Sequence, residues 1–311
     1  MGAAEAKQKL QGILVAAPTQ MKQDYSLDLD GIKKFTRFLV DKGIVNGNGV
    51  ILSTGAGGEH MHLTMEERKK VTAAVVEAAE GKVPVFVGAT HNSTLHAVEL
   101  AKNAASAGAT GLQVSSPYYF VLSEDEVFEY FKAINDAADI GIMVYNDPWA
   151  SGMDMSAEFI GRLAELPHII GLKWATNNGF TRREVYHLFS DRFSIIDNQM
   201  VYVGPGSFMM GARGFVSQVA NFAPEYELNI LRLIRAKEWE KVVRELDRLT
   251  IPYYRILIEA GKEGITGEGN FIKTAVELAG LPAGPARPPH RPLPPKYREK
   301  MRAVLAAAGI G

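Results

Sequence analysis

Residues 141–173 read GIMVYNDPWASGMDMSAEFIGRLAELPHIIGLK, a stretch that begins and ends with a short apolar run. Both runs, GIMVY (141–145) and HIIGLK (168–173), are almost continuously apolar, which indicates strands that are buried on both faces, as parallel sheets require. A segment of helical periodicity follows each run. The stretch therefore predicts a strand-helix unit and the start of the next one.

The same unit recurs along the chain. Six further runs have this character: GILVAA (12–17), GVILS (49–53), VPVFVG (83–88), TGLQVS (110–115), FSIID (193–197) and GFVSQ (214–218). Eight such units favour an α/β fold of the closed (β/α)8 type, the TIM barrel, over an open doubly wound sheet. An open sheet would usually carry fewer units and a phosphate-binding glycine turn after its first strand, which this sequence lacks.

The alternation of strands and helices stops near residue 224, and helical patterns then follow one another to the end. We therefore expect a barrel over residues 1–224 and a C-terminal helical extension over residues 225–311. Within the extension, LPAGPARPPHRPLPP (281–295) carries seven prolines, which exclude a regular helix or a central strand. This segment is predicted to form an extended strap that leads into a last helix.

Composition limits the classes of function. The 34 basic and 35 acidic side chains nearly balance, so no positive charge excess supports nucleic-acid binding, and small molecules are the favoured partners. The chain has no cysteine, which excludes disulfides, thiolate metal ligands and a cysteine nucleophile. It has neither a signal-peptide pattern nor an apolar run long enough to span a bilayer, so we expect a cytoplasmic enzyme without membrane association.

Active sites of barrels lie at the carboxyl ends of the strands, and two such ends carry reactive groups. Lys173 ends an apolar strand, where burial would lower its pKa and leave an amine that can attack a carbonyl. Tyr145 ends the strand before it and could shuttle protons to the same centre. Taken alone, Lys173 could instead extend its charge to the rim, and Tyr145 could be an ordinary core or rim residue.

Two loops after strand ends are further candidates. STGAGGE (53–59) has three glycines, whose backbone N–H groups could converge on a carboxylate, although a tight turn without a ligand is the alternative. SSPYYF (115–120) carries an aromatic cluster that could form a site wall or cross a subunit contact, and simple loop packing is equally compatible.

Together these pieces resemble the dihydrodipicolinate synthase and N-acetylneuraminate lyase family of Schiff-base-forming class I aldolases. The resemblance covers nearly the whole chain and runs through VAAPTQ (15–20), GAGGE (55–59), PYY (117–119), YNDP (145–148), GLKWAT (171–176) and GFVSQVAN (214–221). It implies a barrel with a helical C-terminal domain, usually a homotetramer, that acts on pyruvate or pyruvate-yielding 2-keto acids without metal or organic cofactor.

The resemblance also implies roles for individual residues. Lys173 would form the imine with the substrate, and Tyr145 would shuttle protons. Substrate-binding residues would be Ala56, Gly57 and Gly58 through backbone amides, Tyr119 by entering a neighbouring subunit's site, and Val216 by lining the pocket. A homo-oligomer, dimer or tetramer, is therefore expected.

Departures from the family pattern bear on the substrate. Ala56 and Gly57 replace two threonines of the usual G-T-T-G-E loop, so the threonine step of the proton relay is missing. Ala150 stands where an arginine holds the carboxylate of aspartate semialdehyde. Trp149 and Trp174 are expected to add aromatic bulk near the mouth of the barrel. Beside the loop, HMH (60–62) adds two histidines, for which solvated surface positions are favoured.

These observations favour a Schiff-base lyase, either aldolase or dehydratase, that acts on pyruvate or a 2-keto acid such as a 2-keto-3-deoxy sugar acid. One alternative is a true 4-hydroxy-tetrahydrodipicolinate synthase that condenses pyruvate with aspartate semialdehyde. Another is an inactive barrel that only binds a keto acid. A metal-dependent barrel enzyme is disfavoured because only the histidines at 60 and 62, of seven in the chain, are close in sequence.

Overall fold

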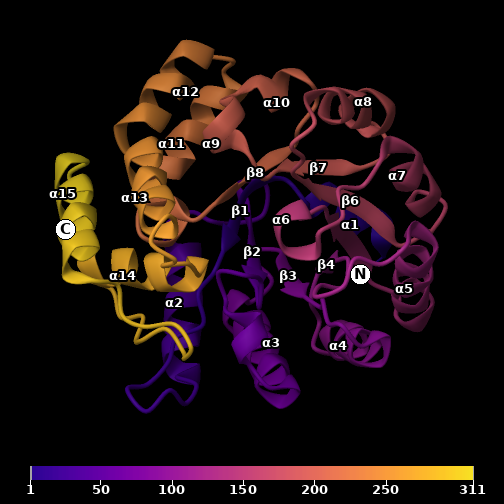
Figure 1. The fold of residues 1–311 in the computed structure, drawn as a ribbon, viewed down its shortest axis with the longest axis horizontal. Coiled ribbons are helices and arrows are strands. Elements are labelled where there is room, and N and C mark those ends of the chain that lie inside the picture. Colours follow the sequence, from indigo (N-terminus) through magenta and orange to yellow (C-terminus); the bar gives the residue numbers. More distant parts are fainter. Residues whose placement is uncertain (1, 311) are drawn as a thin grey trace.

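The computed structural model describes residues 2–310, which form a closed barrel of eight parallel strands in chain order (Figure 1). Neighbouring strands pair in parallel, and β8 pairs with β1 to close the barrel. The fold confirms the predicted (β/α)8 TIM-barrel class, and each predicted strand is present within two residues of its expected ends. The strands are β1 (Gly12–Ala16), β2 (Gly49–Ser53), β3 (Val85–Gly88), β4 (Gly111–Ser115), β5 (Gly141–Tyr145), β6 (Ile169–Trp174), β7 (Ser194–Asp197) and β8 (Gly214–Ser217).

Helices between the strands surround the barrel, and consecutive ones pack against each other (Figure 1). Their beginnings are fixed by side chains, since Thr64 and Ser123 each form a capping box with a glutamate three residues later. The longer helices are α2 (Leu29–Asp41), α3 (Met65–Ala79), α4 (Thr94–Ser106), α5 (Glu124–Ala137), α7 (Ala157–Leu163), α8 (Gly179–Phe189) and α11 (Pro224–Arg235). Short elements are α6 (Pro148–Ser151), α9 (Met200–Val203), α10 (Gly206–Met209) and the 3-10 turns η1 (His60–His62) and η2 (Val219–Asn221).

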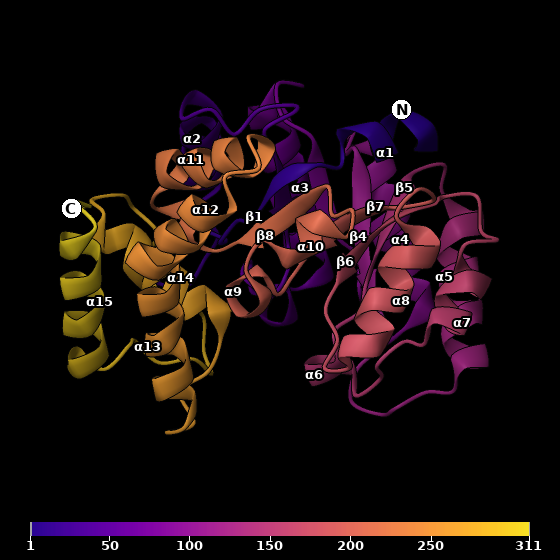
Figure 2. The same cartoon turned by 90° about the horizontal axis from the view of Figure 1, so that it is seen from above.

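Alternation along the strands divides the core into two layers. Side chains that point outward pack against the helices in one large cluster. Side chains that point inward fill the barrel in a smaller cluster made of Ala6, Leu10, Leu14, Val50, Leu52, Phe86, Met143, Ile170 and Ile196. Two of these, Ala6 and Leu10, belong to or directly follow α1 (Ala3–Lys9), which closes one end of the barrel, while α6 lies at the opposite end (Figure 2). Any site inside the barrel must therefore open toward α6.

The C-terminal part consists of α12 (Trp239–Glu245), the π-helical turn η3 (Leu246–Thr250), α13 (Ile251–Gly261), α14 (Glu268–Leu278) and α15 (Pro295–Ala307). These helices lie beside the barrel, with α15 outermost (Figure 1). Residues 281–294 connect α14 to α15 without helix or strand. Since α11 itself packs against β1 and binds the barrel through a 2.7 Å contact between Lys42 and Glu225, the domain division at residue 224 stays a prediction.

No helix within residues 2–310 is both long and apolar enough to cross a membrane.

Candidate active site

Lys173 and Tyr145 lie side by side inside the open end of the barrel. They are register partners on β6 and β5, and the Lys173 Nζ atom lies 3.8 Å from the centre of the Tyr145 ring. Tyr145 points inward because it lies two residues after Met143 of the interior cluster. Lys173 points inward because its two neighbours, Leu172 and Trp174, both belong to the outer cluster. Lys173 is 5% exposed and Tyr145 is 8% exposed. The two residues predicted from separate strand ends are thus brought together in one buried position.

Burial dominates the electrostatics of this pair. It lowers the pKa of Lys173, and the negative charges of Glu268 and Asp147 partly oppose that shift. Burial also raises the pKa of Tyr145, to which Asp147 and Glu268 add, while a hydrogen bond from Asn198 opposes it. The amide of Asn198 donates to the Tyr145 hydroxyl at 3.2 Å. The arrangement favours an uncharged amine beside a protonated phenol, which suits attack on a carbonyl followed by proton transfer.

Asn146 fixes the position of the loop that follows Tyr145. Its side-chain amide donates to Asp154 Oδ1 and to the carbonyl of Ala175, both at 2.7 Å, and its oxygen accepts from the N–H of Met155 at 3.0 Å. These bonds tie the end of β5 to the end of β6. Because Asn146 is 1% exposed and fully hydrogen-bonded, it holds the Lys173–Tyr145 pair in register rather than facing a substrate.

The glycine loop after β2 offers two free backbone donors. Gly58 N–H bonds to the Gly55 carbonyl at 3.1 Å, and Glu59 N–H bonds to the Ala56 carbonyl at 3.0 Å, which closes the turn. In the described chain, the N–H groups of Ala56 and Gly57 make no such bond. This differs from the predicted set, because the Gly58 amide shapes the turn instead of facing a ligand. The N–H groups of Ala56 and Gly57 are thus left as candidate donors to an anion.

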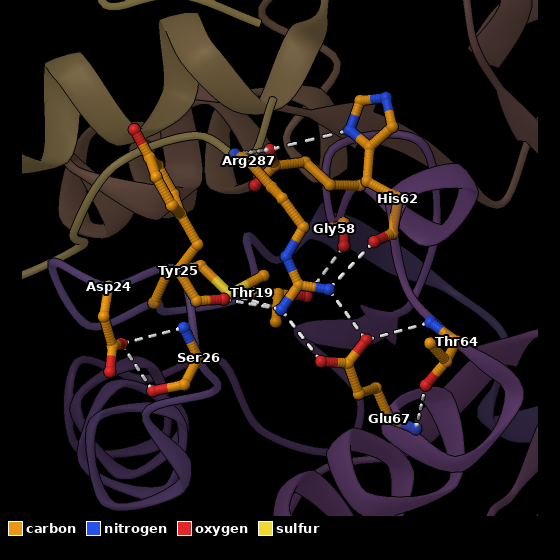
Figure 3. A network of polar contacts seen from close by, with 11 residues as sticks. Thr19, Asp24, Tyr25, Ser26, Gly58, His62, Thr64, Glu67 and Arg287 are labelled. Atoms are coloured by element: carbon orange, nitrogen blue, oxygen red, sulfur yellow. Dashed lines mark hydrogen bonds and ion pairs between the residues drawn. The ribbon is translucent and has the colours of Figure 1, made fainter. Parts of the chain in front are cut away.

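Gly57 stands where a side chain would crowd its neighbours. A Cβ added there would lie 2.9 Å from Ile272 Cδ1 on α14 and 3.1 Å from the Ala16 carbonyl of β1. The glycine loop is therefore wedged between the barrel and the C-terminal extension. Thr19 completes the support, since its hydroxyl donates to the Gly58 carbonyl at 2.7 Å (Figure 3).

The C-terminal extension holds the glycine loop through a buried ion pair. Glu59, the last residue of the loop, pairs with Lys273 of α14, and both side chains are 2% exposed. The second carboxylate oxygen of Glu59 accepts the backbone N–H of Arg287 at 2.9 Å, and Lys273 also donates to the Pro285 carbonyl at 2.9 Å. Both Arg287 and Pro285 belong to the proline-rich strap. The predicted strap is thus part of the structure that positions the loop.

The Arg287 guanidinium extends this clamp to the neighbouring loops. It binds both carboxylate oxygens of Glu67 at 2.7 and 2.9 Å, and it donates to the carbonyls of His62 at 2.9 Å and Tyr25 at 2.6 Å (Figure 3). A planar guanidinium suits such a bidentate contact. Through one side chain, the strap joins the loops after β1 and β2.

Two predicted substrate-binding residues occupy different environments. Val216 on β8 is partly buried and packs against the interior cluster, and its place in a substrate pocket stays a proposal. Tyr119 is 85% exposed and has a positive φ of 94°. It packs edge-on against Phe120 at 4.8 Å between ring centres, and Phe120 is also exposed. Within one chain, the Tyr119 ring is therefore exposed to solvent, and its role in a neighbouring subunit stays a proposal.

The structure corrects the expected places of three aromatic residues. Trp174 does not lie at the barrel mouth, because alternation along β6 turns it outward into the helix layer, where it is fully buried. His60 is not a solvated surface residue, since both of its ring nitrogens are buried and burial lowers its pKa to about 4. His62 is also largely covered, and its ring packs 4.9 Å from that of His290 in the strap.

No sequence pattern indicated the acidic residues that act on the pair. Asp147 follows Tyr145 by two residues, and within YNDP (145–148) the sequence pattern indicated a role for Tyr145 alone. Glu268 is 95 residues from Lys173 in sequence and begins α14. No local sequence pattern predicts that Glu268 comes near Lys173, because this depends on the packing of α14 against the glycine loop. Asn198, directly after β7, was likewise not indicated by any sequence pattern.

Within residues 2–310, no group of three or more histidine, aspartate or glutamate side chains is arranged to hold a metal ion.

Comparison of the sequence with known proteins gives a consistent result. Residues 9–308 match the family described as the dihydrodipicolinate synthetase family. A relative from Gluconacetobacter diazotrophicus, named 4-hydroxy-tetrahydrodipicolinate synthase, is 31% identical over 96% of this chain and 97% of its own. A relative of the same name from Rhodopseudomonas palustris is 32% identical over 96% of this chain and 97% of its own.

Solved structures agree with these relatives. Dihydrodipicolinate synthase from Acinetobacter baumannii, complexed with pyruvate, superimposes with a TM-score of 0.87 at 27% identity and covers 97% of this chain and 100% of its own. A prophage protein from E. coli that belongs to the dihydrodipicolinic acid synthase family, also in complex with pyruvate, has a TM-score of 0.86 at 25% identity. That comparison covers 97% of this chain and 99% of the other.

Proposed function

The chain belongs to the dihydrodipicolinate synthetase family and is a lyase of aldolase type, and from this premise we propose that Lys173 forms an imine with a 2-keto acid. The observation that carries the proposal is the position of the Lys173 amine, buried inside the open end of the barrel and 3.8 Å from the Tyr145 ring. Relatives whose structures contain pyruvate support this choice of substrate class.

The first steps follow from the geometry. The Lys173 amine attacks C2 of the keto acid, and the N–C bond forms as the carbonyl oxygen takes up a proton. Loss of that oxygen as water gives an iminium, with Tyr145 as the donor and acceptor of the protons that move. The substrate carboxylate is placed at the free N–H groups of Ala56 and Gly57, and Val216 lines the wall. No metal or organic cofactor takes part in this scheme.

The iminium withdraws electrons from the adjacent carbon, and two outcomes are open from it. When the C4 hydroxyl gives its proton to Tyr145, the C3–C4 bond breaks, an aldehyde is released and the bonding electrons leave an enamine on Lys173. The enamine is protonated at C3, and hydrolysis of the resulting iminium releases pyruvate. Alternatively, a C3 proton is lost to Tyr145, and the enamine expels the C4 hydroxyl, which takes up a proton and leaves as water. Hydrolysis of the resulting iminium then releases a dehydrated keto acid. We favour a 2-keto-3-deoxy sugar acid or a similar compound as substrate, because Ala150 replaces the arginine that would hold the carboxylate of aspartate semialdehyde.

A turnover assay tests this choice. Purified protein is incubated with 2-keto-3-deoxy sugar acids, and pyruvate release is coupled to lactate dehydrogenase, while dehydrated keto acids are followed by mass spectrometry. In parallel, pyruvate is supplied with aspartate semialdehyde. We expect turnover of the sugar acids. Efficient condensation with aspartate semialdehyde would instead identify a 4-hydroxy-tetrahydrodipicolinate synthase, and imine formation without any product would identify a binding protein.

We also propose that the active assembly is a homo-oligomer, dimer or tetramer, that places Tyr119 at a neighbouring subunit's site. The exposed pair Tyr119–Phe120 supports this, since a tyrosine held at positive φ with its ring in solvent gains nothing within a single chain.

A further inference from the structure

Two carboxylates flank the imine lysine at the open end of the barrel. Asp147 follows β5 and precedes α6, and it is partly buried. Glu268 begins α14 and is exposed to solvent at this end. The residue after it, Gly269, lies against the glycine loop, because a Cβ there would come within 3.1 Å of the Gly57 carbonyl. Both carboxylates are therefore close enough to Lys173 to act on its charge.

Electrostatics supports this placement. The negative charges of Glu268 and Asp147 both stabilise the protonated form of Lys173 and so raise its pKa. Asp147 also repels the charge of Glu268 and so raises the pKa of Glu268. Enclosure by protein raises the pKa of Glu268 even though its side chain still reaches solvent. The charges of the three groups therefore interact with one another at the open end of the barrel.

Lys173 is the group that marks this space as a ligand site. Its side chain is 95% buried, points inward from β6, and makes no hydrogen bond or ion pair with any of residues 2–310 apart from its contact with the Tyr145 ring. A buried ammonium or amine without a polar partner is rare unless a ligand completes it.

The basic side chains on the neighbouring loops are already engaged by protein groups. Lys273 pairs with Glu59, and Arg287 binds Glu67. The guanidinium of Arg68 donates to two backbone carbonyls, and that of Arg182 donates to Thr176 and Gln199. None of these four cations is left to pair with a second acidic group on a substrate.

We propose that Asp147 and Glu268 set the charge selectivity of the site, admitting a 2-keto acid whose distal part is uncharged and hydroxylated and excluding one that carries a second carboxylate. This inference rests on the proposed imine chemistry of Lys173. The first carboxylate of the substrate is met by backbone N–H groups, and the iminium supplies one positive charge. A second carboxylate would face two like charges without a counter-ion, whereas hydroxyl groups can donate hydrogen bonds to both.

Imine formation itself provides the test, because it requires no turnover. The probes are 2-oxoglutarate and its 5-methyl ester, which differ in the distal charge and little in size. Adducts are trapped with borohydride and counted by intact mass, and half-saturating concentrations are expressed relative to pyruvate for the same protein. We expect the half-saturating concentration for adduct formation to be about tenfold lower for the ester than for 2-oxoglutarate. One uncompensated charge at a partly solvated site produces an effect of about this size.

Charge-removing variants locate the effect. Glu268→Gln and Asp147→Asn preserve shape, and each should reduce the ratio between the two probes several-fold, with the double variant reducing it further. Glu158→Gln, which removes an exposed carboxylate on α7, should leave the ratio unchanged. High salt should narrow the ratio on the native protein, which gives a measurement that does not depend on any variant.

The outcomes separate this inference from the proposed function. No adduct with pyruvate on the native protein would refute the imine chemistry. A pyruvate adduct with equal saturation by both longer probes, or a ratio that the variants leave unchanged, would refute only the charge selectivity. A pyruvate adduct without any adduct from either longer probe would also refute it, because the site would then select by length.

Discussion

Replacement of Lys273 by methionine should destabilise the protein and weaken its hold on a substrate carboxylate. In the folded chain Lys273 compensates the charge of Glu59, and both side chains are 2% exposed. Methionine keeps the aliphatic volume but leaves the Glu59 carboxylate buried, with the N–H of Arg287 as its remaining donor. Removal of one partner of a buried ion pair costs about 3–5 kcal/mol, and the lost bond to the Pro285 carbonyl falls within the same range.

The assay is urea unfolding followed by circular dichroism at fixed protein concentration and pH 7. Lys273→Met should lower the free energy of unfolding by about 3–5 kcal/mol. The double variant Glu59→Gln/Lys273→Met removes both charges and should recover more than half of that loss. Because Glu59 ends the glycine loop, the single variant should also need more pyruvate to half-saturate imine formation.

A loss below about 1 kcal/mol for the single variant would refute the reasoning, since it is the value of an exposed ion pair. A double variant that is as unstable as the single one would refute it equally, because the cost would then not come from the unpaired carboxylate. Lys300→Met, which breaks an exposed pair with Glu259, is the matched control.

Three further predictions follow from single side chains. Burial raises the pKa of Glu227 to about 8, so the folded state holds this proton more tightly than the unfolded state, and the resulting stability is lost as pH rises from 4.5 to about 8. In urea unfolding across that window, the free energy of unfolding of Glu227→Gln should rise relative to that of the native protein by about 1.4 kcal/mol per pH unit. Burial lowers the pKa of Lys173 and Glu268 opposes this, so Glu268→Gln should move the acid limb of the pH profile for imine formation to lower pH, and an unmoved limb would contradict the assigned contact. Tyr119→Ala should change the free energy of unfolding of the single chain by no more than about 0.5 kcal/mol, yet weaken self-association in sedimentation; unchanged association would argue against its place at a subunit contact.

The strands of the barrel could be predicted from sequence because each is buried on both faces and therefore consists of a nearly continuous run of apolar residues. The pair Lys173 and Tyr145 could be predicted for the same reason, since a polar residue that ends such a run is conspicuous. The sequence did not indicate as clearly whether a residue at a strand end points into the barrel or toward the surrounding helices. Trp174 follows Lys173 directly, and one step along a strand reverses the direction of the side chain, which is why it lies in the helix layer.

The acidic surroundings and the clamp on the glycine loop could not be predicted in this way. Glu268, Lys273 and Arg287 lie in the C-terminal extension, and their contacts with the barrel depend on how that extension packs. His60 illustrates the same limit, because a histidine in a polar loop gives no sign that neighbouring elements will cover it. Local patterns specify elements and strand ends, whereas tertiary packing decides which distant charges meet at the site.

Intact mass after borohydride reduction in the presence of pyruvate tests the central claim most directly. The measurement compares the native chain, Lys173→Ala and the control Lys262→Ala, which removes an exposed lysine of the C-terminal extension. We predict one reduced pyruvate adduct on the native chain and on the control, and none on Lys173→Ala. An adduct that survives the loss of Lys173, or no adduct on the native chain, would contradict the assignment of this lysine as the imine-forming group.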